Sequence, residues 1–183
     1  KWTETCGRRL HRLICYISST LDFTMHGWVG DDLAQCEPHL YADADYAGCT
    51  LTQRSTSGAH MCMVGPHTRF PSGALSKRQA CVSNSTPEAE MVAMDAALRL
   101  LGLPGLSLWD TVLGRPARLV LHEDNQAMLR VCQTGRNPTM RYLRRTHRTS
   151  VAWLHEVCTS DIVVLAYIES AKMAAGIYIY IYI

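Results

Sequence analysis

The spacing of apolar residues predicts a helix at the start of the chain. They recur at helical intervals over residues 3–18, at Leu10, Leu13, Ile14 and Ile17. The arginines of this segment fall largely on the opposite side, so the helix is expected to be amphipathic. The run LDFTMHGWV (21–29) has the composition of a strand. Residues 30–38 carry turn-forming and acidic residues with little apolar content, and we expect a domain boundary within this connector.

From residue 39 onward the pattern is that of short strands separated by polar turns. The segments LYADADYAG, GAHMCMVG (58–65) and TRFPSGALS (68–76) are separated by polar segments such as TQRSTSG and GPH. Runs of this length bounded by turn-forming residues are typical of strands. They predict an antiparallel meander of three strands.

A helix with a well-marked start is predicted after the meander. In NSTPEAEMVAMDAALRLLGL, Ser85 or Thr86 is placed to cap the helix and Pro87 suits its first position. Glu88 is favourable near the positive N-terminal end of the helix. A second short helix is expected after Pro104, over residues 105–114.

The rest of the chain alternates between strands and helices. Strands are expected over 117–124 and 161–168, and helices over 124–133, over 141–158 and from 169 to 175. Strands that are joined by helices are usually parallel. The order therefore predicts a mixed α/β sheet with helices packed on it.

Acidic residues lie at element ends that such a sheet can bring together. Asp43 and Asp45 belong to the first strand of the meander, Glu88 and Glu90 to the first turn of the helix, and Asp124 ends the fourth strand. If the first and fourth strands are neighbours, Asp43 and Asp124 converge, and Glu90 reaches in from the helix. Converging carboxylates either raise one another's pKa or bind a cation, for which Mg²⁺ is suited. Two ions about 4 Å apart would clamp the attacking water and the leaving oxygen of a phosphodiester. The alternative is that these acids are ordinary turn and helix-start residues.

Four arginines share one face of the helix expected over residues 141–158. Their spacing is i, i+3, i+4 and i+7, at Arg141, Arg144, Arg145 and Arg148. Such a stripe suits a phosphate backbone, whereas a solvated helix face is the alternative. His147, beside them, either moves protons near a metal site or belongs to the basic surface.

Composition narrows the class of protein without deciding its function. The 183 residues are 48% hydrophobic and 19% charged, which favours a globular domain over a disordered chain. The net charge is only +2, so binding of nucleic acid needs a local basic patch. The eight cysteines lack zinc-ribbon or thioredoxin-like spacing, which favours a reduced intracellular setting. Acidic and basic residues interrupt the C-terminal apolar region before it reaches the roughly 20 residues of a membrane span, so no membrane partner is expected.

Several of these segments occur together in one known family. YADADYAG, RSTSGAHMCMVG, ALSKRQACVSNSTPEAEMVAM and LHEDNQAM resemble the ribonuclease H (RNase H) segment of the Pol polyprotein of copia-type LTR retrotransposons. THRTSVAWLHE followed by DIVVLAYIESAKMAA resembles the C-terminal part of that segment. The start of the chain is similar to the stretch that joins the reverse transcriptase to it. The resemblance covers about residues 1–175, in order.

The resemblance implies a fold and a division of the chain. It implies an RNase H-like fold over residues 39–175, with a five-stranded mixed sheet of three antiparallel and then two parallel strands flanked by helices. Residues 1–38 would be a remnant of the reverse-transcriptase connection, with one helix and one strand. Residues 176–183, GIYIYIYI, are interpreted as a low-complexity tail.

The resemblance also implies an activity and its residues. Asp43, Glu90 and Asp124 would be the catalytic, metal-binding carboxylates, with Asp45, Glu88 and His147 as auxiliary groups. The activity would be endonucleolytic hydrolysis of the RNA strand of RNA·DNA hybrids during reverse transcription. It would use Mg²⁺ or Mn²⁺, with two ions. The expected partners are the hybrid, held by the arginine stripe, and the reverse-transcriptase domain of the same polyprotein. The expected location is inside the cell, in a cytoplasmic retrotransposon particle with access to the nucleus.

One feature of the family is missing from this chain. The family has a fourth acidic residue in its final helix, and Gly176 stands at that place, where the Ile-Tyr repeat begins. Three readings follow. The chain is an RNase H of full or reduced activity, a catalytically weakened module that binds nucleic acid or packs on a polymerase, or a relic of a decayed Pol copy that folds poorly.

Overall fold

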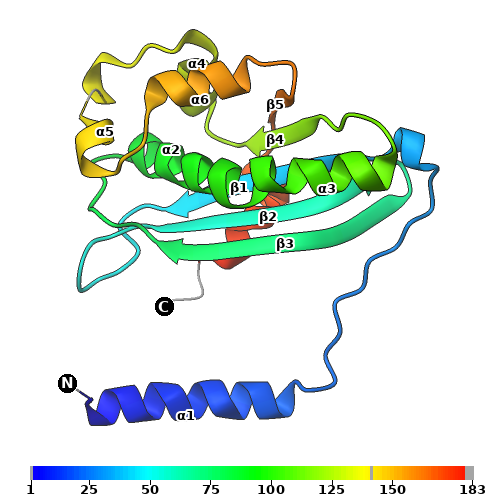
Figure 1. The fold of residues 1–183 in the computed structure, drawn as a ribbon. Helices are drawn as coiled ribbons and strands as arrows, with labels where there is room; N and C mark the ends of the chain where they lie inside the picture. The colour runs from blue at the N-terminus through cyan, green and yellow to red at the C-terminus, as the bar shows by residue number, and fades with distance from the viewer. Residues whose placement is uncertain (1, 141, 180–183) are drawn as a thin grey trace.

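Five strands form one mixed sheet in the computed structural model, which describes residues 2–140 and 142–179. They are β1 (Glu37–Asp45), β2 (Thr56–Gly65), β3 (Thr68–Arg78), β4 (Leu119–Glu123) and β5 (Val163–Tyr167). Their order is β3-β2-β1-β4-β5 (Figure 1). β1, β2 and β3 pair antiparallel, whereas β4 is parallel to both β1 and β5. The predicted fold class is therefore confirmed.

Alternation along the central strands decides which residues enter the core. Leu40 and Ala42 of β1 are fully buried, as are Leu119 and Leu121 of β4. Since successive side chains of a strand point to opposite faces, these four lie on the face that packs against the helices. The intervening positions form the other face, where Tyr41 of β1 lies opposite His122 of β4 in the parallel register.

A single helical run covers one face of the sheet, where the sequence had predicted two helices. It consists of α2 (Thr86–Ala97), a π-helical turn (Leu98–Gly102) and α3 (Leu103–Leu113). Pro104 follows the π-helical turn at the second position of α3, and the helical run continues through it. The 28-residue run is long and apolar enough to cross a membrane by length and composition alone. Its buried Met91, Met94 and Leu98, however, pack in the core, which accounts for its composition.

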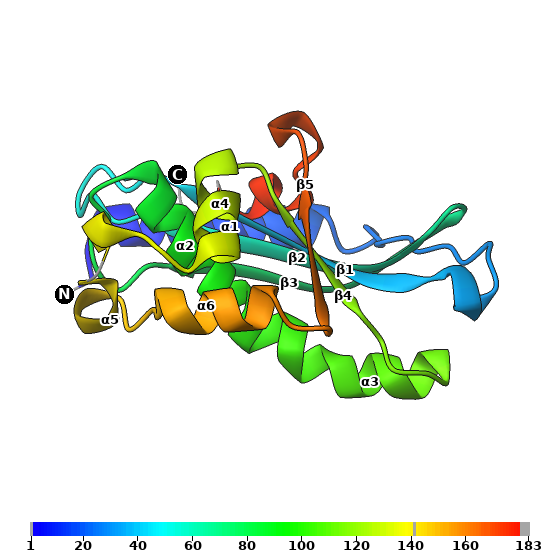
Figure 2. The ribbon, with the colours of Figure 1, turned by 90° about the horizontal axis from the view of Figure 1, so that it is seen from above.

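Three further helices complete this side of the core. They are α4 (Gln126–Thr134), α5 (Leu143–Thr146) and α6 (Val151–Cys158). Met128 of α4, Leu143 of α5 and Leu154 of α6 join one cluster with the buried residues of α2 and the sheet. Seen from above, α2 and α4 lie over the strands, and α6 lies beside them (Figure 2).

The N-terminal segment differs from the prediction in one respect. The predicted helix is present as α1 (Glu4–Ser19), none of whose residues is buried, and Figure 1 shows it apart from the sheet. The predicted strand over 21–29 is wrong, because only Trp28 pairs, with Arg69 of β3. The next pairing position in an antiparallel ladder would be Pro71, which has no N–H to donate. The ladder therefore stops after one bridge.

The predicted last helix is also wrong. Two short 3₁₀ turns, Ser170–Lys172 and Ala174–Tyr178, follow β5. They are separated by the extended backbone of Met173, whose side chain packs in a buried cluster with Tyr41. The second turn lies against β2, on the face of the sheet that the long helices leave free. Of the Ile-Tyr repeat, residues 180–183 lie outside the described part of the chain.

Candidate metal centre

Asp43 lies near the end of β1, the central strand of the sheet. It is opposite Gly58 of β2 in the antiparallel register. The backbone N–H of Ala44 donates to Asp43 Oδ1 at 2.8 Å. This contact and the pairing of the backbone with β2 restrict the movement of the carboxylate.

Asp124 and Glu90 approach Asp43 from two other elements. Asp124 directly follows β4, the parallel neighbour of β1, so the two strands end at the same edge of the sheet. Glu90 lies near the start of α2, whose N-cap is Ser85. The N–H of Glu88 donates to Ser85 Oγ at 3.3 Å, which sets where the helix begins.

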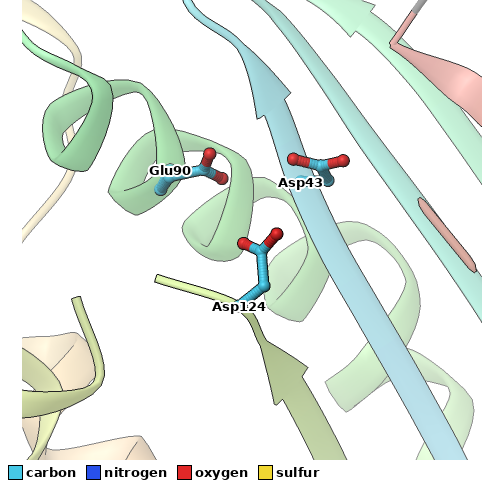
Figure 3. Close-up of side chains that lie close together, drawn as sticks. All are labelled: Asp43, Glu90 and Asp124. Atoms are coloured by element: carbon cyan, nitrogen blue, oxygen red, sulfur yellow. The ribbon is translucent and has the colours of Figure 1, made fainter. Parts of the chain in front are cut away.

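The three carboxylates converge. One oxygen from each of Asp43, Glu90 and Asp124 lies within 4.8 Å of the others. Figure 3 shows Asp43 on β1, Glu90 on α2 and Asp124 just beyond β4, with their carboxylates facing a common space. Among the described residues, this is the one group of three or more His, Cys, Asp or Glu side chains with such geometry.

The site disfavours negative charge when no cation is present. Burial raises the pKa of Glu90 to about 10, and the carboxylates of Glu123, Asp43 and Asp124 contribute to the rise. Burial also raises the pKa of Asp43, helped by the carboxylate of Asp124. Like charges this close oppose one another's ionisation, and a bound cation removes that opposition.

The donor set fits a hard divalent cation. All three groups offer carboxylate oxygens, which are the ligands that Mg²⁺ and Mn²⁺ accept. Glu90 Oε2 is buried and has no hydrogen-bond partner among the described residues. A buried carboxylate oxygen without a partner is costly, and a cation would satisfy it.

A pocket lies between these acids and the two 3₁₀ turns at the end of the chain. Asp43 and Asp124 line it together with Ser170 and Gly176. A Cβ atom placed on Gly176 would lie 3.3 Å from Asp43 Oδ2. A side chain at position 176 would therefore enter the site, and the glycine supplies no ligand there.

Two of the auxiliary acids have hydrogen-bond partners of their own, although Asp45 also lines the pocket beside Asp43 and Asp124. Asp45 accepts a hydrogen bond from the backbone N–H of Thr56, across the β1–β2 pair. Glu88 is buried and accepts from Tyr142 Oη at 2.7 Å and from the N–H of Asn84 at 3.0 Å. Neither belongs to the group of converging carboxylates.

His147 also lies outside the carboxylate group. Its side chain is only 1% exposed, and its Nε2 lies 3.2 Å from Glu88 Oε1. The two atoms do not meet the geometry of a hydrogen bond. This position beside Glu88 links the segment after α5 to the start of α2.

The predicted arginine stripe is wrong as a helix face. The segment expected to be one helix is divided into α5 and α6, and Arg148 between them has a φ of 60°. This left-handed conformation ends the first helix, and Ser150 caps the second by accepting from the N–H of Trp153. Arg141 lies outside the described residues. Arg144, Arg145 and Arg148 are exposed, and Arg144 lines a pocket with Arg136.

Sequence reasoning missed one acid, Glu123. It is the last residue of β4, is fully buried, and is the largest charge influence on Glu90. Burial raises the pKa of Glu123 to about 8. Its position could have indicated this burial, because buried and partly exposed residues alternate along β4 and Glu123 comes two residues after the buried Leu121.

Comparison with known proteins supports the fold. No protein-family model and no curated protein matches the chain. The fold is similar to that of LC11-RNase H1, isolated from compost by a metagenomic approach, with 17% identity, a TM-score of 0.53, and coverage of 78% of this chain and 92% of that one. It is also similar to LC11-RNase H1 in complex with an RNA/DNA hybrid, with 15% identity, a TM-score of 0.52, and coverage of 78% and 94%. The chain therefore has an RNase H-like fold.

Proposed function

We propose that this protein is a metal-dependent ribonuclease H that hydrolyses the RNA strand of RNA·DNA hybrids. The observation that carries the proposal is the convergence of Asp43, Glu90 and Asp124 at the edge of an RNase H-like sheet. The similarity to LC11-RNase H1, whose complex contains an RNA/DNA hybrid, supports a hybrid as the substrate.

The chain's own residues would hold and orient the reacting groups. Asp43 and Asp124 present carboxylates from the ends of two paired strands, and Glu90 supplies a buried carboxylate from the helix. Mg²⁺ or Mn²⁺, with two ions as the family pattern implies, would lower the pKa of a bound water and stabilise charge on the phosphodiester. The stiffness of the strands keeps the carboxylates in place between turnovers.

Exposed arginines would hold the nucleic acid. Arg144, Arg145 and Arg148, together with Arg136, lie on the segment between α4 and α6. Their guanidinium groups suit contacts with backbone phosphates, which carry no sequence information. Recognition of the hybrid would rest on its shape and on the 2′-OH of the RNA strand.

The origin of the chain belongs to the same proposal. The motifs of copia-type Pol polyproteins support a retrotransposon RNase H that works with the reverse-transcriptase domain of the same polyprotein, in a cytoplasmic particle with access to the nucleus. Residues 1–38 would belong to the connection and residues 39–175 to the RNase H-like domain. The exposed apolar side of α1 is consistent with a contact to another part of such a polyprotein.

A cleavage assay tests the activity. The full chain is incubated with a hybrid whose RNA strand is labelled, in Mg²⁺, in Mn²⁺ and in EDTA, beside the same RNA single-stranded. We expect metal-dependent cutting of the RNA in the hybrid alone. Asp22→Asn, which removes an exposed carboxylate far along the chain from the site, serves as a charge-matched control and should cut normally. Failure of the wild-type chain to cut in either metal would overturn the proposal.

A second candidate is a module that binds hybrids without cutting them. Gly176 favours this candidate. It lies beside Asp43, where a side chain could supply a further metal ligand, and glycine supplies none. Hybrid binding measured by fluorescence anisotropy, without loss of the RNA strand, would support this candidate over the enzyme.

A further inference from the structure

Glu123 is a buried acid for which the proposed reaction has no use. It lies on the helix-facing side of β4, in line with Leu119 and Leu121, and its residue exposure is 0%. Its Oε2 has no hydrogen-bond partner among the described residues. Burying a carboxyl group in this way is unfavourable, and an apolar residue would fit the alternation of the strand better. A costly residue beside a site is expected where it has a role there.

The other oxygen of Glu123 makes a specific contact. Glu123 Oε1 accepts from the backbone N–H of Asn125 at 3.0 Å, and so spans the residue between them, Asp124. Asn125 is fixed in turn, because its Oδ1 accepts from the N–H groups of Ala127 at 3.0 Å and Met128 at 3.2 Å, at the start of α4. On the other side, the N–H of Ile168 donates to the backbone oxygen of Glu123 at 3.1 Å.

These contacts hold Asp124 between two anchored neighbours. Asp124 is no longer in the β4–β5 ladder, which ends at Glu123, and it precedes the first residue of α4. Its backbone conformation therefore depends on the turn. Without the Oε1 acceptor, the Asn125 N–H would lose its partner, and the turn could shift to find another.

We propose that Glu123 is a positioning residue for Asp124, whose carboxylate it directs toward Asp43 and Glu90 by holding the turn between β4 and α4. This inference rests on the proposed function, because it assigns Asp124 to the metal centre. It assigns to Glu123 no contact with substrate or metal.

Two substitutions separate the acceptor from the charge. Glu123→Gln keeps an oxygen at the same place, so it should preserve the contact with the Asn125 N–H. Glu123→Met has a similar length and cannot make the contact. Leu121→Val, on the same buried face of β4, disturbs packing without touching the turn and is the control for a purely structural effect.

The measurement is Mn²⁺ binding to the full-length protein by calorimetry, with the Mn²⁺ dependence of hybrid cleavage and the KM for the hybrid alongside. We expect Glu123→Met to raise the Mn²⁺ dissociation constant by about tenfold or more, as loss of a residue that orients a metal ligand does. Glu123→Gln and Leu121→Val should stay within about twofold of wild type, and the KM for the hybrid should not change.

Two results would overturn the inference. Wild-type binding in Glu123→Met would mean that the turn does not need Glu123. An equal loss in Glu123→Gln and Glu123→Met would mean that the charge matters and the acceptor does not. A wild-type chain that binds Mn²⁺ without cutting the hybrid would instead overturn the proposed nuclease, and the comparison of Mn²⁺ binding among the variants would still decide the role of Glu123.

Discussion

The carboxylate site and the arginine segment, residues 136–148, differ in what holds them. Asp43 belongs to a strand paired on both sides, and Glu90 belongs to a capped helix packed on the sheet. The described part of the arginine segment, without residue 141, contains a 3₁₀ turn (Pro138–Met140) and the four-residue α5. Its anchors include the buried Leu143, the buried side chain of His147 beside Glu88, and the hydrogen bond from Tyr142 to Glu88.

This difference has a functional consequence. Groups that must meet within a few ångströms of a metal need stiff support, which the central strands provide. Groups that contact a phosphate backbone tolerate movement, because the attraction is long-ranged and carries no strict geometry. We therefore expect changes at the carboxylates to act on the chemical step and changes at the arginines to act on binding.

The largest effect is expected at the carboxylates. Asp43→Asn or Asp124→Asn removes an anionic ligand with little change of shape, and should lower the rate of hybrid cleavage about a hundredfold to a thousandfold, since metal-assisted stabilisation contributes several kcal/mol. The melting temperature of the metal-free protein should not fall. Single-turnover cleavage measures the first quantity and calorimetry the second. Unchanged cleavage in either variant would remove that residue from the site.

At the arginine segment the effect should fall on affinity. Changing Arg144, Arg145 and Arg148 to Gln should weaken hybrid binding about tenfold or more. The slope of log K against log salt should become shallower by about 0.9 for each arginine that contacts a phosphate. Anisotropy titrations between low and moderate salt measure both.

The matched control removes the same charge elsewhere. Arg8, Arg9 and Arg12 are exposed on α1, so changing these three to Gln lowers the net charge equally. A slope that changes as much in this control as in the segment variant would show a general effect of charge, and the assigned contact surface would be wrong.

A smaller effect, a gain in metal affinity, is expected from adding a carboxylate at position 176. Gly176→Asp would place a carboxylate next to Asp43 and should lower the Mg²⁺ concentration for half-maximal cleavage several-fold, because an added anionic ligand tightens the site. Gly176→Asn has the same shape without the charge and is the control. Because the segment is a 3₁₀ turn, no gain in helix stability is expected from Gly176→Ala. Equal behaviour of the Asp and Asn variants would show that a missing carboxylate does not limit the site.

The smallest effect concerns the stability of the metal-free protein. The pKa of Glu90 rises from its usual 4.5 to about 10 on folding, so the folded state holds a proton that the unfolded state releases. Stability is therefore lost as the pH rises from about 4.5 toward 10. Glu90→Gln removes this loss and should raise the melting temperature at pH 8, by about 2–4 °C for each 1 kcal/mol of stability regained.

Added Mg²⁺ gives the complementary result. It should raise the melting temperature of the wild-type protein, since it binds the folded state, and should have little effect on Glu90→Gln. The exposed Glu156→Gln is the control and should behave as wild type in both experiments. If Glu90→Gln melts below the wild-type protein in EDTA, the ionisation of Glu90 does not destabilise the folded state as assigned.

Prediction from sequence succeeded where a pattern is local and strong. The strands of the meander alternate or carry β-forming residues, and the start of α2 has Ser85 and Pro87 in their preferred places. Prediction from sequence failed where contacts between residues far apart in the chain determine the local structure. Pro71 of β3 stops the pairing of residues 21–29, and the packing of Met173 beside Tyr41 divides the last segment into two turns. At Arg148 the left-handed backbone breaks a helix that spacing alone would continue.

The sequence by itself predicted the strands of the meander and the start of α2, because these depend on residue type and local spacing, and its resemblance to a known family singled out the three acids. Only the tertiary structure decided that oxygens of Asp43, Glu90 and Asp124 come within 4.8 Å of one another. That convergence arises from the parallel pairing of β1 with β4, strands that are far apart in the chain. The place of Glu123 was decided in the same way, since its burial and its contact with the Asn125 N–H exist only once β4 and α4 have packed into the core.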